Sequence, residues 1–234
     1  LLAIAGPTAA GKSSLGIALA LRWNGEIINC DSVQVYRGFD IGTGKVPPDA
    51  RQGIPHHLLD IADPEQVFTA GDYRQHAIRV LSDVRDRGRL PIIVGGTGLY
   101  LRALLLGLFE GPQRSEALRE RLKLLALRRS REFLHRMLRR LDPQSAARIH
   151  PRDTPKAVRA LEVCILARQP LTVMHERGRE GLQGFRVLKV GLSPNRQQLT
   201  QRINDRVEQM FRAGLLDEVR DMLSRRDSGR IKAL

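Results

Sequence analysis

The sequence has 234 residues, of which 42% are hydrophobic, and a formal net charge of +14 at pH 7. That length allows one sizeable domain, or a core domain that carries a smaller insertion. No run of roughly eighteen apolar residues and no secretion signal occurs, so we expect a cytoplasmic protein without a transmembrane helix. Cys30 and Cys164 lie far apart without a metal-ligand spacing, so we expect neither a zinc site nor a disulfide.

Positive charge is concentrated in the second half of the sequence. Residues 1–109 carry 11 Lys and Arg side chains against 10 Asp and Glu, whereas residues 110–234 carry 28 against 15. Of the 39 basic residues 33 are Arg, whose planar guanidinium suits bidentate contacts with phosphate. An Arg-rich genome could account for the total, so the uneven distribution is the better guide. It favours a surface for an anionic polymer on the second half.

Short apolar runs alternate with helical patterns in the first hundred residues. The runs at residues 1–5, 26–30 and 90–94 end at Gly, Pro or Asp and predict buried strands. Residues 12–23 and 72–87 show the apolar spacing of helices. Strands that alternate with helices in this way predict an α/β fold with a parallel sheet.

A basic helical segment interrupts this pattern. Residues 115–141 and 154–168 have helical spacing, and no strand pattern occurs near them. A strand pattern returns at residues 185–192, and an amphipathic helix is predicted at residues 195–212. We therefore expect a discontinuous core domain of residues 1–110 and 185–234 and an all-helical insertion domain of residues 111–184.

The eight residues after the first predicted strand match the P-loop pattern GxxxxGK[ST]. They are Gly6, Pro7, Thr8, Ala9, Ala10, Gly11, Lys12 and Ser13. The loop amides and Lys12 would bind phosphate oxygens, and the Ser13 hydroxyl would hold Mg²⁺. The pattern predicts a P-loop NTPase-like sheet flanked by helices. It leaves open whether the phosphates belong to a nucleotide such as ATP or to another diphosphate.

Asp31 follows the second predicted strand, at the sheet edge where α/β proteins bind ligands. A carboxylate there could accept a proton or bind Mg²⁺, or it could only form a turn. The third strand ends at Gly95 and lacks the Asp of a Walker B pattern, which counts against a motor-type NTPase. His56 and His57 lie between Pro55 and two leucines, and we interpret them as a structural turn without a catalytic role.

Longer motifs resemble those of the tRNA dimethylallyltransferases, also called isopentenyltransferases of tRNA. The matching segments are GPTAAGKSSL from Gly6, INCDSVQVYRGFDIGTGK from Ile28, HHLLDI from His56, LPIIVGGTGLYLRALL from Leu90, ARIHPRD from Ala147, RALEV from Arg159 and LSPNRQQLTQRINDRVEQMFRAGLLDEV from Leu192. They span almost the whole chain in the family's order, and DSVQVY, DIGTGK and GGTGLYLRAL are far more specific than the P-loop. The zinc-finger tail of the eukaryotic members is absent, which points to the bacterial type.

The resemblance implies a reaction and the residues that perform it. The donor would be dimethylallyl diphosphate, bound with Mg²⁺ at the P-loop, and the acceptor would be the exocyclic amine of an adenosine next to the anticodon of tRNA. Asp31 would act as general base, with Thr97 and Arg206 near the diphosphate. The implied tRNA contacts are Asp31, Ser32, Val33, Gln34, Thr97, Arg119, Pro155, Lys156, Ala157, Val158 and Arg159.

Two other functions stay open on the residues alone. A small-molecule or nucleoside kinase would share the P-loop, the parallel sheet and a helical lid, but the basic second half disfavours it. A noncatalytic RNA-binding protein could use the P-loop as a nucleotide switch, but Asp31 and Thr97 beside the phosphate site disfavour that. The family's Gly-Tyr-containing stretch and basic C-terminal helix are missing, so we expect an incomplete chain, and we expect it to be a monomer.

Overall fold

A parallel sheet forms the centre of the first of two compact units in this computed structural model, which describes residues 1–176, 180–225 and 231. The strand order is β3-β2-β4-β1-β5, and every neighbouring pair is parallel. The strands are β1 (Leu2–Ala5), β2 (Gly25–Asn29), β3 (His56–His57), β4 (Leu90–Gly95) and β5 (Leu188–Gly191). The predicted α/β fold is confirmed.

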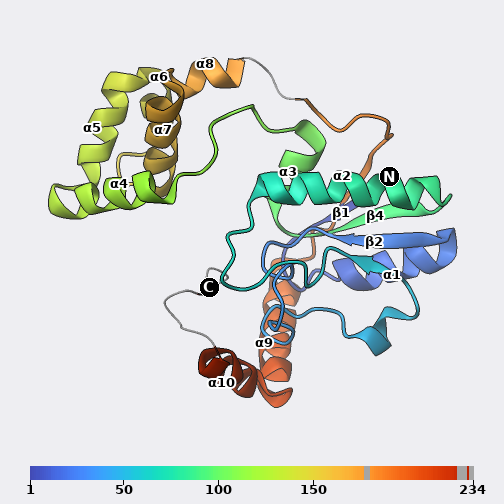
Figure 1. Ribbon diagram of the computed structural model, residues 1–234. Coiled ribbons are helices and arrows are strands. Elements are labelled where there is room, and N and C mark those ends of the chain that lie inside the picture. Colours follow the sequence, from blue (N-terminus) through green and yellow to red (C-terminus); the bar gives the residue numbers. More distant parts are fainter. Residues whose placement is uncertain (177–179, 226–230, 232–234) are drawn as a thin grey trace. The chain divides into compact units, whose positions relative to one another are not determined.

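Helices cover both faces of this sheet. Helix α1 (Lys12–Trp23) packs on one face, and α2 (Ala70–Asp86) and α3 (Gly98–Leu106) pack on the other (Figure 1). Strand β1 contributes to both layers, since Leu2 packs with the α1 side and Ala3 with the α2 side. Strands buried on both faces favour apolar residues on both sides, which is why β1 and β4 read as nearly continuous apolar runs.

Side-chain caps set where two helices of this unit begin. Thr69 and Asp72 form a reciprocal capping box, so α2 begins at Ala70, two residues before the predicted start. The Asn195 side chain accepts from the Gln197 N–H and starts α9 (Arg196–Arg212). A helix absent from the prediction, α10 (Leu215–Arg225), follows α9, and a short 3₁₀ helix spans Pro48–Arg51. No helix in the described residues is long and apolar enough to cross a membrane.

The two adjacent histidines form a strand, and the predicted turn at this place is wrong. His56 pairs with Ile27 as part of β3, at the edge of the sheet beside β2. His57 Nε2 lies 2.6 Å from Glu26 Oε2, which also accepts from Arg87 Nη2 at 2.6 Å. Glu26 is buried, so these two partners satisfy a carboxylate that would otherwise be costly inside the fold. The pair therefore has a structural role in joining β3 to β2.

The second compact unit comprises Gly107–Gly181, and all its described regular elements are helices. Leu122, Leu134, Leu138 and Leu161 form its apolar core. The helices are α4 (Glu116–Arg128), α5 (Arg131–Leu141), α6 (Pro143–Arg148), α7 (Thr154–Ala167) and α8 (Leu171–Glu176). The unit has its own core, separate from the apolar layers on the two sides of the sheet.

A fully buried carboxylate, Glu162, links α4 to α7 inside this helical unit. Arg119 donates to both of its oxygens, at 2.9 and 2.8 Å, and Arg159 donates to one of them at 2.6 Å. The backbone N–H of Ser115 adds a bond of 2.8 Å. Burial by itself would raise the pKa of Glu162, but these hydrogen bonds lower it to about 2. The carboxylate is therefore ionised at neutral pH.

We predict that Glu162→Gln lowers the free energy of unfolding by about 3 kcal/mol at pH 7, because it leaves Arg119 and Arg159 without their buried counter-charge. The folded-state pKa lies below the ordinary value of 4.5. The stabilisation is therefore complete above that ordinary value and is lost as the pH falls toward 2. Urea unfolding followed by helical circular dichroism, at pH 7 and at pH 3, measures both effects.

Glu120→Gln is the matched control, since Glu120 lies on α4 in an exposed ion pair with Lys123. Its effect should stay within about 0.5 kcal/mol. Equal losses for the two variants, or a Glu162→Gln loss that does not shrink at pH 3, would contradict this account of the buried cluster.

Candidate functional site

Three segments meet at the carboxyl-end edge of the sheet. The P-loop follows β1, Asp31 follows β2, and Thr97 follows β4, and these three strands are neighbours in the order β2-β4-β1. The Thr97 N–H donates to the Cys30 carbonyl at 3.2 Å. A Cβ at Gly95 would overlap that same carbonyl, so only glycine allows the two strand ends to approach this closely. Parallel pairing thus gathers the predicted residues at one edge.

The P-loop wraps around the start of α1. Gly11 precedes the helix with φ +87°, a left-handed conformation that glycine adopts without strain, and Ala9 also has a positive φ of 60°. The Lys12 ammonium donates to the Pro7 carbonyl at 2.7 Å, which holds it over the loop. The free N–H groups of the first turn of α1 and the Lys12 charge form a phosphate-binding arrangement.

Asp31 lies in a tight turn that Thr97 supports. Asp31 Oδ1 accepts from the N–H groups of Val33 at 3.0 Å and Gln34 at 3.4 Å. Thr97 Oγ1 accepts from the Ser32 N–H at 2.9 Å. Within the described part of the chain, Asp31 Oδ2 receives no hydrogen bond. One carboxylate oxygen is thus fixed by the turn, and the other is available to a ligand.

These segments line one cavity of about 340 Å³. Its polar side has Lys12, Ser13 and Asp31, and Arg206 reaches it from α9. Its apolar lining includes one face of α9, with Ile203, Val207 and Met210. The complete lining is Thr8, Lys12, Ser13, Asn29, Asp31, Val33, Gln34, Gly42, Thr43, Gly44, Val94, Gly95, Ile203, Arg206, Val207 and Met210. The cavity therefore combines a site for an anion with an apolar surface.

Three charged groups interact across this cavity. Partial burial lowers the pKa of Lys12, the negative charge of Asp31 raises it, and the positive charge of Arg206 lowers it. Two cations and one carboxylate are thus near enough to influence one another. An anion of more than one charge would relieve the repulsion between Lys12 and Arg206.

The loop of residues 40–45 holds Arg206 in place. Arg206 Nη2 donates to the Thr43 carbonyl at 3.2 Å, and its guanidinium lies against Gly44, where a Cβ would overlap it. Gln34 Nε2 donates to the carbonyls of Thr43 and Gly44, at 3.0 and 3.2 Å. The Thr43 carbonyl thus orients one side chain from α9 and one from the Asp31 turn, and the Gly44 carbonyl adds a second bond to the latter.

The structure brings some predicted residues to this cavity and not others. Thr8, Lys12, Ser13, Asp31, Val33, Gln34 and Arg206 line it. Thr97 is absent from its lining and acts through its hydrogen bond to Ser32. The described residues hold no cluster of three or more His, Cys, Asp or Glu that could bind a metal.

The predicted tRNA contacts at Arg119 and at residues 155–159 belong to the helical unit. The side chains of Ala157 and Val158 are 1% and 3% exposed and pack in the core of that unit, so a tRNA contact at these two positions stays a prediction for the backbone alone. Neither side chain can touch RNA, and Pro155, Lys156 and Arg159 remain as accessible groups.

Comparison with known proteins shows the family of this chain. The family model described as IPP transferase matches residues 34–234. This chain belongs to the IPP transferase family. The tRNA dimethylallyltransferase of Solibacter usitatus is 55% identical over 224 residues, which are 96% of this chain and 73% of the relative. That of Geobacter metallireducens is 46% identical over 234 residues, which are 100% of this chain and 76% of the relative.

Solved structures extend the comparison to the fold. The full-length tRNA isopentenylpyrophosphate transferase of Bacillus halodurans is 40% identical, with a TM-score of 0.64 over 97% of this chain and 71% of that one. A eukaryotic dimethylallyltransferase acting on tRNA is 29% identical, with a TM-score of 0.84 over 99% of this chain and 57% of that one. The likeness to IPP transferases therefore includes both compact units.

The sequence does not predict every part of this candidate site. The periodicity of residues 195–212 predicts an apolar face on α9 but not what that face contacts, and Ile203 and Val207 on it line the cavity. The sequence of the DIGTGK motif does not predict that its backbone carbonyls accept hydrogen bonds. Those of Thr43 and Gly44 accept from Gln34, and that of Thr43 also accepts from Arg206. The glycines of the motif were the available signal, since Gly44 has φ +60° and lies directly against the guanidinium.

We predict that Gly44→Ala weakens the binding of inorganic diphosphate about tenfold, because the added methyl group displaces the Arg206 guanidinium from the cavity and removes a charge-assisted contact. Isothermal titration calorimetry measures the Kd. Gly53→Ala is the control, since Gly53 also has a left-handed backbone, with φ +74°, but open space around its Cβ position. If both variants lose affinity equally, backbone strain is responsible and the role of Arg206 is not supported.

Proposed function

We propose that this chain transfers a dimethylallyl group from dimethylallyl diphosphate to the exocyclic amine of an adenosine next to the anticodon of tRNA, and releases diphosphate. One observation carries the proposal. A phosphate-binding loop, a carboxylate and an apolar helix face line the same cavity. A kinase would need the first two features, but the apolar face of α9 beside the carboxylate fits a hydrocarbon donor better.

The P-loop side of the cavity binds the leaving group. The amides at the start of α1, Lys12 and Arg206 surround the diphosphate and stabilise the negative charge that develops as the allylic C–O bond breaks. Lys12 is already fixed by Pro7 and Arg206 by Thr43, so little rearrangement is needed at the moment of reaction.

Asp31 accepts the proton of the acceptor amine. The exocyclic amine of adenine is a weak nucleophile, since its lone pair is delocalised into the ring. A carboxylate that takes its proton while the new N–C bond forms lowers the barrier. The fixed oxygen Oδ1 orients the group, and Oδ2 is the oxygen that would accept the proton. The prenyl carbons lie against Ile203, Val207 and Met210, which keep water from the allylic cation.

Mg²⁺ is proposed as the cofactor, and the oxygen donors in the cavity fit it. Mg²⁺ prefers oxygen ligands and is usually bound through one or two protein oxygens together with substrate phosphates. The Ser13 hydroxyl follows Lys12 at the start of α1 and would hold the ion, which would neutralise diphosphate charge when bound.

The helical unit is proposed to bind the tRNA backbone. Lys156 is exposed at the start of α7, and Arg159 projects from the same helix, oriented by Glu162. Base stacking buries an anticodon-loop adenine, so the target has to leave the stack to enter the cavity. We further propose that the protein acts in the cytoplasm and as a monomer.

The proposed function is tested by incubating the chain with Mg²⁺, labelled dimethylallyl diphosphate and unmodified tRNA. Label should move to the tRNA, and a parallel reaction with ATP and no prenyl donor should consume no ATP. The IPP transferase of Bacillus halodurans serves as positive control under the same conditions. Label transfer by the control only, with ATP consumed by this chain, would contradict the proposal and favour a kinase.

We predict that Asp31→Asn lowers kcat for prenyl transfer by about 100-fold, because the amide cannot accept the amine proton. The Kd for inorganic diphosphate should change less than about threefold, because the substitution removes at most about one contact to diphosphate. Single-turnover transfer and calorimetry measure the two effects. Asp63→Asn, at an exposed ion pair with Arg37, is the control. An unchanged kcat in Asp31→Asn would remove Asp31 from the mechanism.

We predict that Lys156→Ala weakens tRNA binding roughly fivefold at low salt and reduces the slope of log Kd against log salt by about one, as expected for one lost phosphate contact. Lys123→Ala is the control, because Lys123 is also exposed in the helical unit and paired to an acid three residues away. Filter binding at several salt concentrations measures the slope. Equal slopes for both variants would show that Lys156 has no specific contact.

A further inference from the structure

Glu218 on α10 binds a row of three backbone amides in the loop of residues 40–45. The N–H groups of Asp40 and Ile41 donate to its Oε2, each at 2.7 Å, and the N–H of Gly42 donates to its Oε1 at 2.9 Å. Consecutive N–H groups that point to one place form an anion-binding concavity, and charge-assisted bonds of this length are strong. The protein fills this concavity with a side chain that lies 178 residues away in the sequence.

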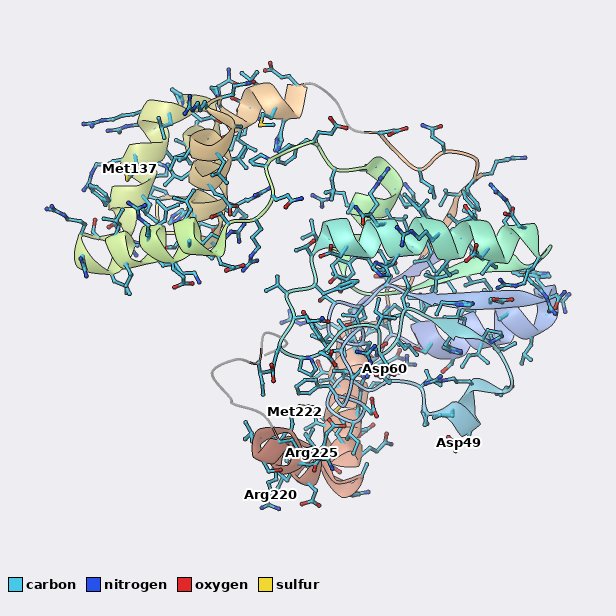
Figure 2. The ribbon with its side chains drawn as sticks, in the orientation of Figure 1. Asp49, Asp60, Met137, Arg220, Met222 and Arg225 are labelled. Carbon is cyan, nitrogen blue, oxygen red and sulfur yellow. The ribbon has the colours of Figure 1, made fainter. Side chains whose placement is uncertain are left out.

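Helix α10 also packs closely on the same part of the chain. A Cβ at Gly42 would lie 3.1 Å from Leu215 Cδ1 and 3.3 Å from Glu218 Oε1. A Cβ at Gly38 would lie 2.8 Å from the Met222 methyl group, and Met222 is labelled on α10 in Figure 2. Glycine at both positions lets the helix approach the loop backbone. The carboxylate therefore reaches the amides through a close and specific contact.

The other end of the loop is fixed by Lys45. This lysine is buried, and its ammonium donates to the Tyr36 carbonyl at 2.7 Å and to Asp40 Oδ1 at 2.8 Å, with a further bond to Asp60. A second hollow of about 740 Å³ is lined in part by Ile41, Gly44 and Lys45. Polar bonds therefore hold the loop at both ends, from Glu218 at residues 40–42 and from the Lys45 ammonium at its end.

The same loop also holds side chains in the reaction cavity. Its carbonyls at Thr43 and Gly44 accept from Gln34 Nε2, and the Thr43 carbonyl accepts from Arg206 Nη2. Gly42, Thr43 and Gly44 themselves line the cavity. Movement of the amides at residues 40–42 would therefore move the carbonyls that hold two cavity side chains.

We propose that Glu218 is a positioning residue for prenyl transfer. Resting on the function proposed above, its role is to fix the loop of residues 40–45 and through it the Arg206 guanidinium that faces the leaving diphosphate. Glu218 touches neither substrate nor reacting atoms in this scheme. Its contribution lies in the orientation of Arg206 and Gln34.

A neighbouring acidic residue separates this role from a general effect of charge on α10. Asp217 and Glu218 both lie in the first turn of that helix, where negative charge is favourable. Asp217 is paired with Arg220 at 2.9 Å, and its side chain is 80% exposed. Asp217→Asn thus removes the same charge from the same helical turn without touching the loop.

The test compares Glu218→Gln and Glu218→Ala with Asp217→Asn. We expect kcat/KM for dimethylallyl diphosphate to fall about tenfold in Glu218→Gln and further in Glu218→Ala, because the amide keeps one acceptor oxygen. The KM for tRNA should stay within twofold. Amide hydrogen exchange at Asp40, Ile41 and Gly42 should accelerate in both variants. Asp217→Asn should match the wild type in every measurement.

One further measurement keeps the outcomes separate. The Kd for inorganic diphosphate should rise in the Glu218 variants, and it is readable even if the wild type transfers no label. Absent transfer in the wild type would overturn the proposed function alone. Unchanged exchange at residues 40–42, an unchanged diphosphate Kd in Glu218→Gln, or equal losses in Asp217→Asn would each overturn the positioning role. If Glu218→Ala fails to fold, the Gln variant decides.

Discussion

The parallel hydrogen bonding of β1, β4 and β2 is the constraint on which this site depends. Because neighbouring parallel strands end at the same edge, the segments that follow them meet there: the P-loop, Thr97 and Asp31. The Cys30 carbonyl and Gly95 show how closely the strand ends approach. If one of these three strands were antiparallel to the others, the segment that follows it would lie at the opposite edge, away from the other two segments.

The sheet, the P-loop and the position of Asp31 could be predicted because each has a local signal. A doubly covered parallel strand requires a continuous apolar run, and a phosphate loop requires glycines at fixed spacing before a lysine. Thr97 and Arg206 were placed by resemblance to a family and not by any pattern of their own. The short strand β3 was missed, since two histidines have no apolar pattern and pair through Glu26 and β2.

What the sequence could not predict are contacts between residues that are distant in the chain. Glu162 reads as an ordinary polar position of α7, yet it is fully buried because Arg119 from α4 and Arg159 share its charge. Glu218 reads as an exposed helix residue, yet it binds amides 176 to 178 residues earlier. The glycines of the DIGTGK motif indicate an unusual backbone, but they cannot name the side chain that approaches it.

Acidic residues determine which of the many basic side chains of this chain are held in a fixed orientation. Cations placed near one another repel, and long arginine side chains lose entropy when they are fixed. Glu162 orders Arg119 and Arg159 in the helical unit, and Asp31 lies where Lys12 and Arg206 interact in the other unit.

Glu218 acts on Arg206 indirectly, because it binds the loop whose Thr43 carbonyl accepts a hydrogen bond from Arg206. A buried or fixed carboxylate thus holds a nearby guanidinium in one orientation. Only a guanidinium with a fixed orientation can bind the transition state more strongly than the bound substrate. The uneven distribution of charge along the chain favours an anionic partner, whereas the placement of a few carboxylates determines which cations are held in a fixed orientation.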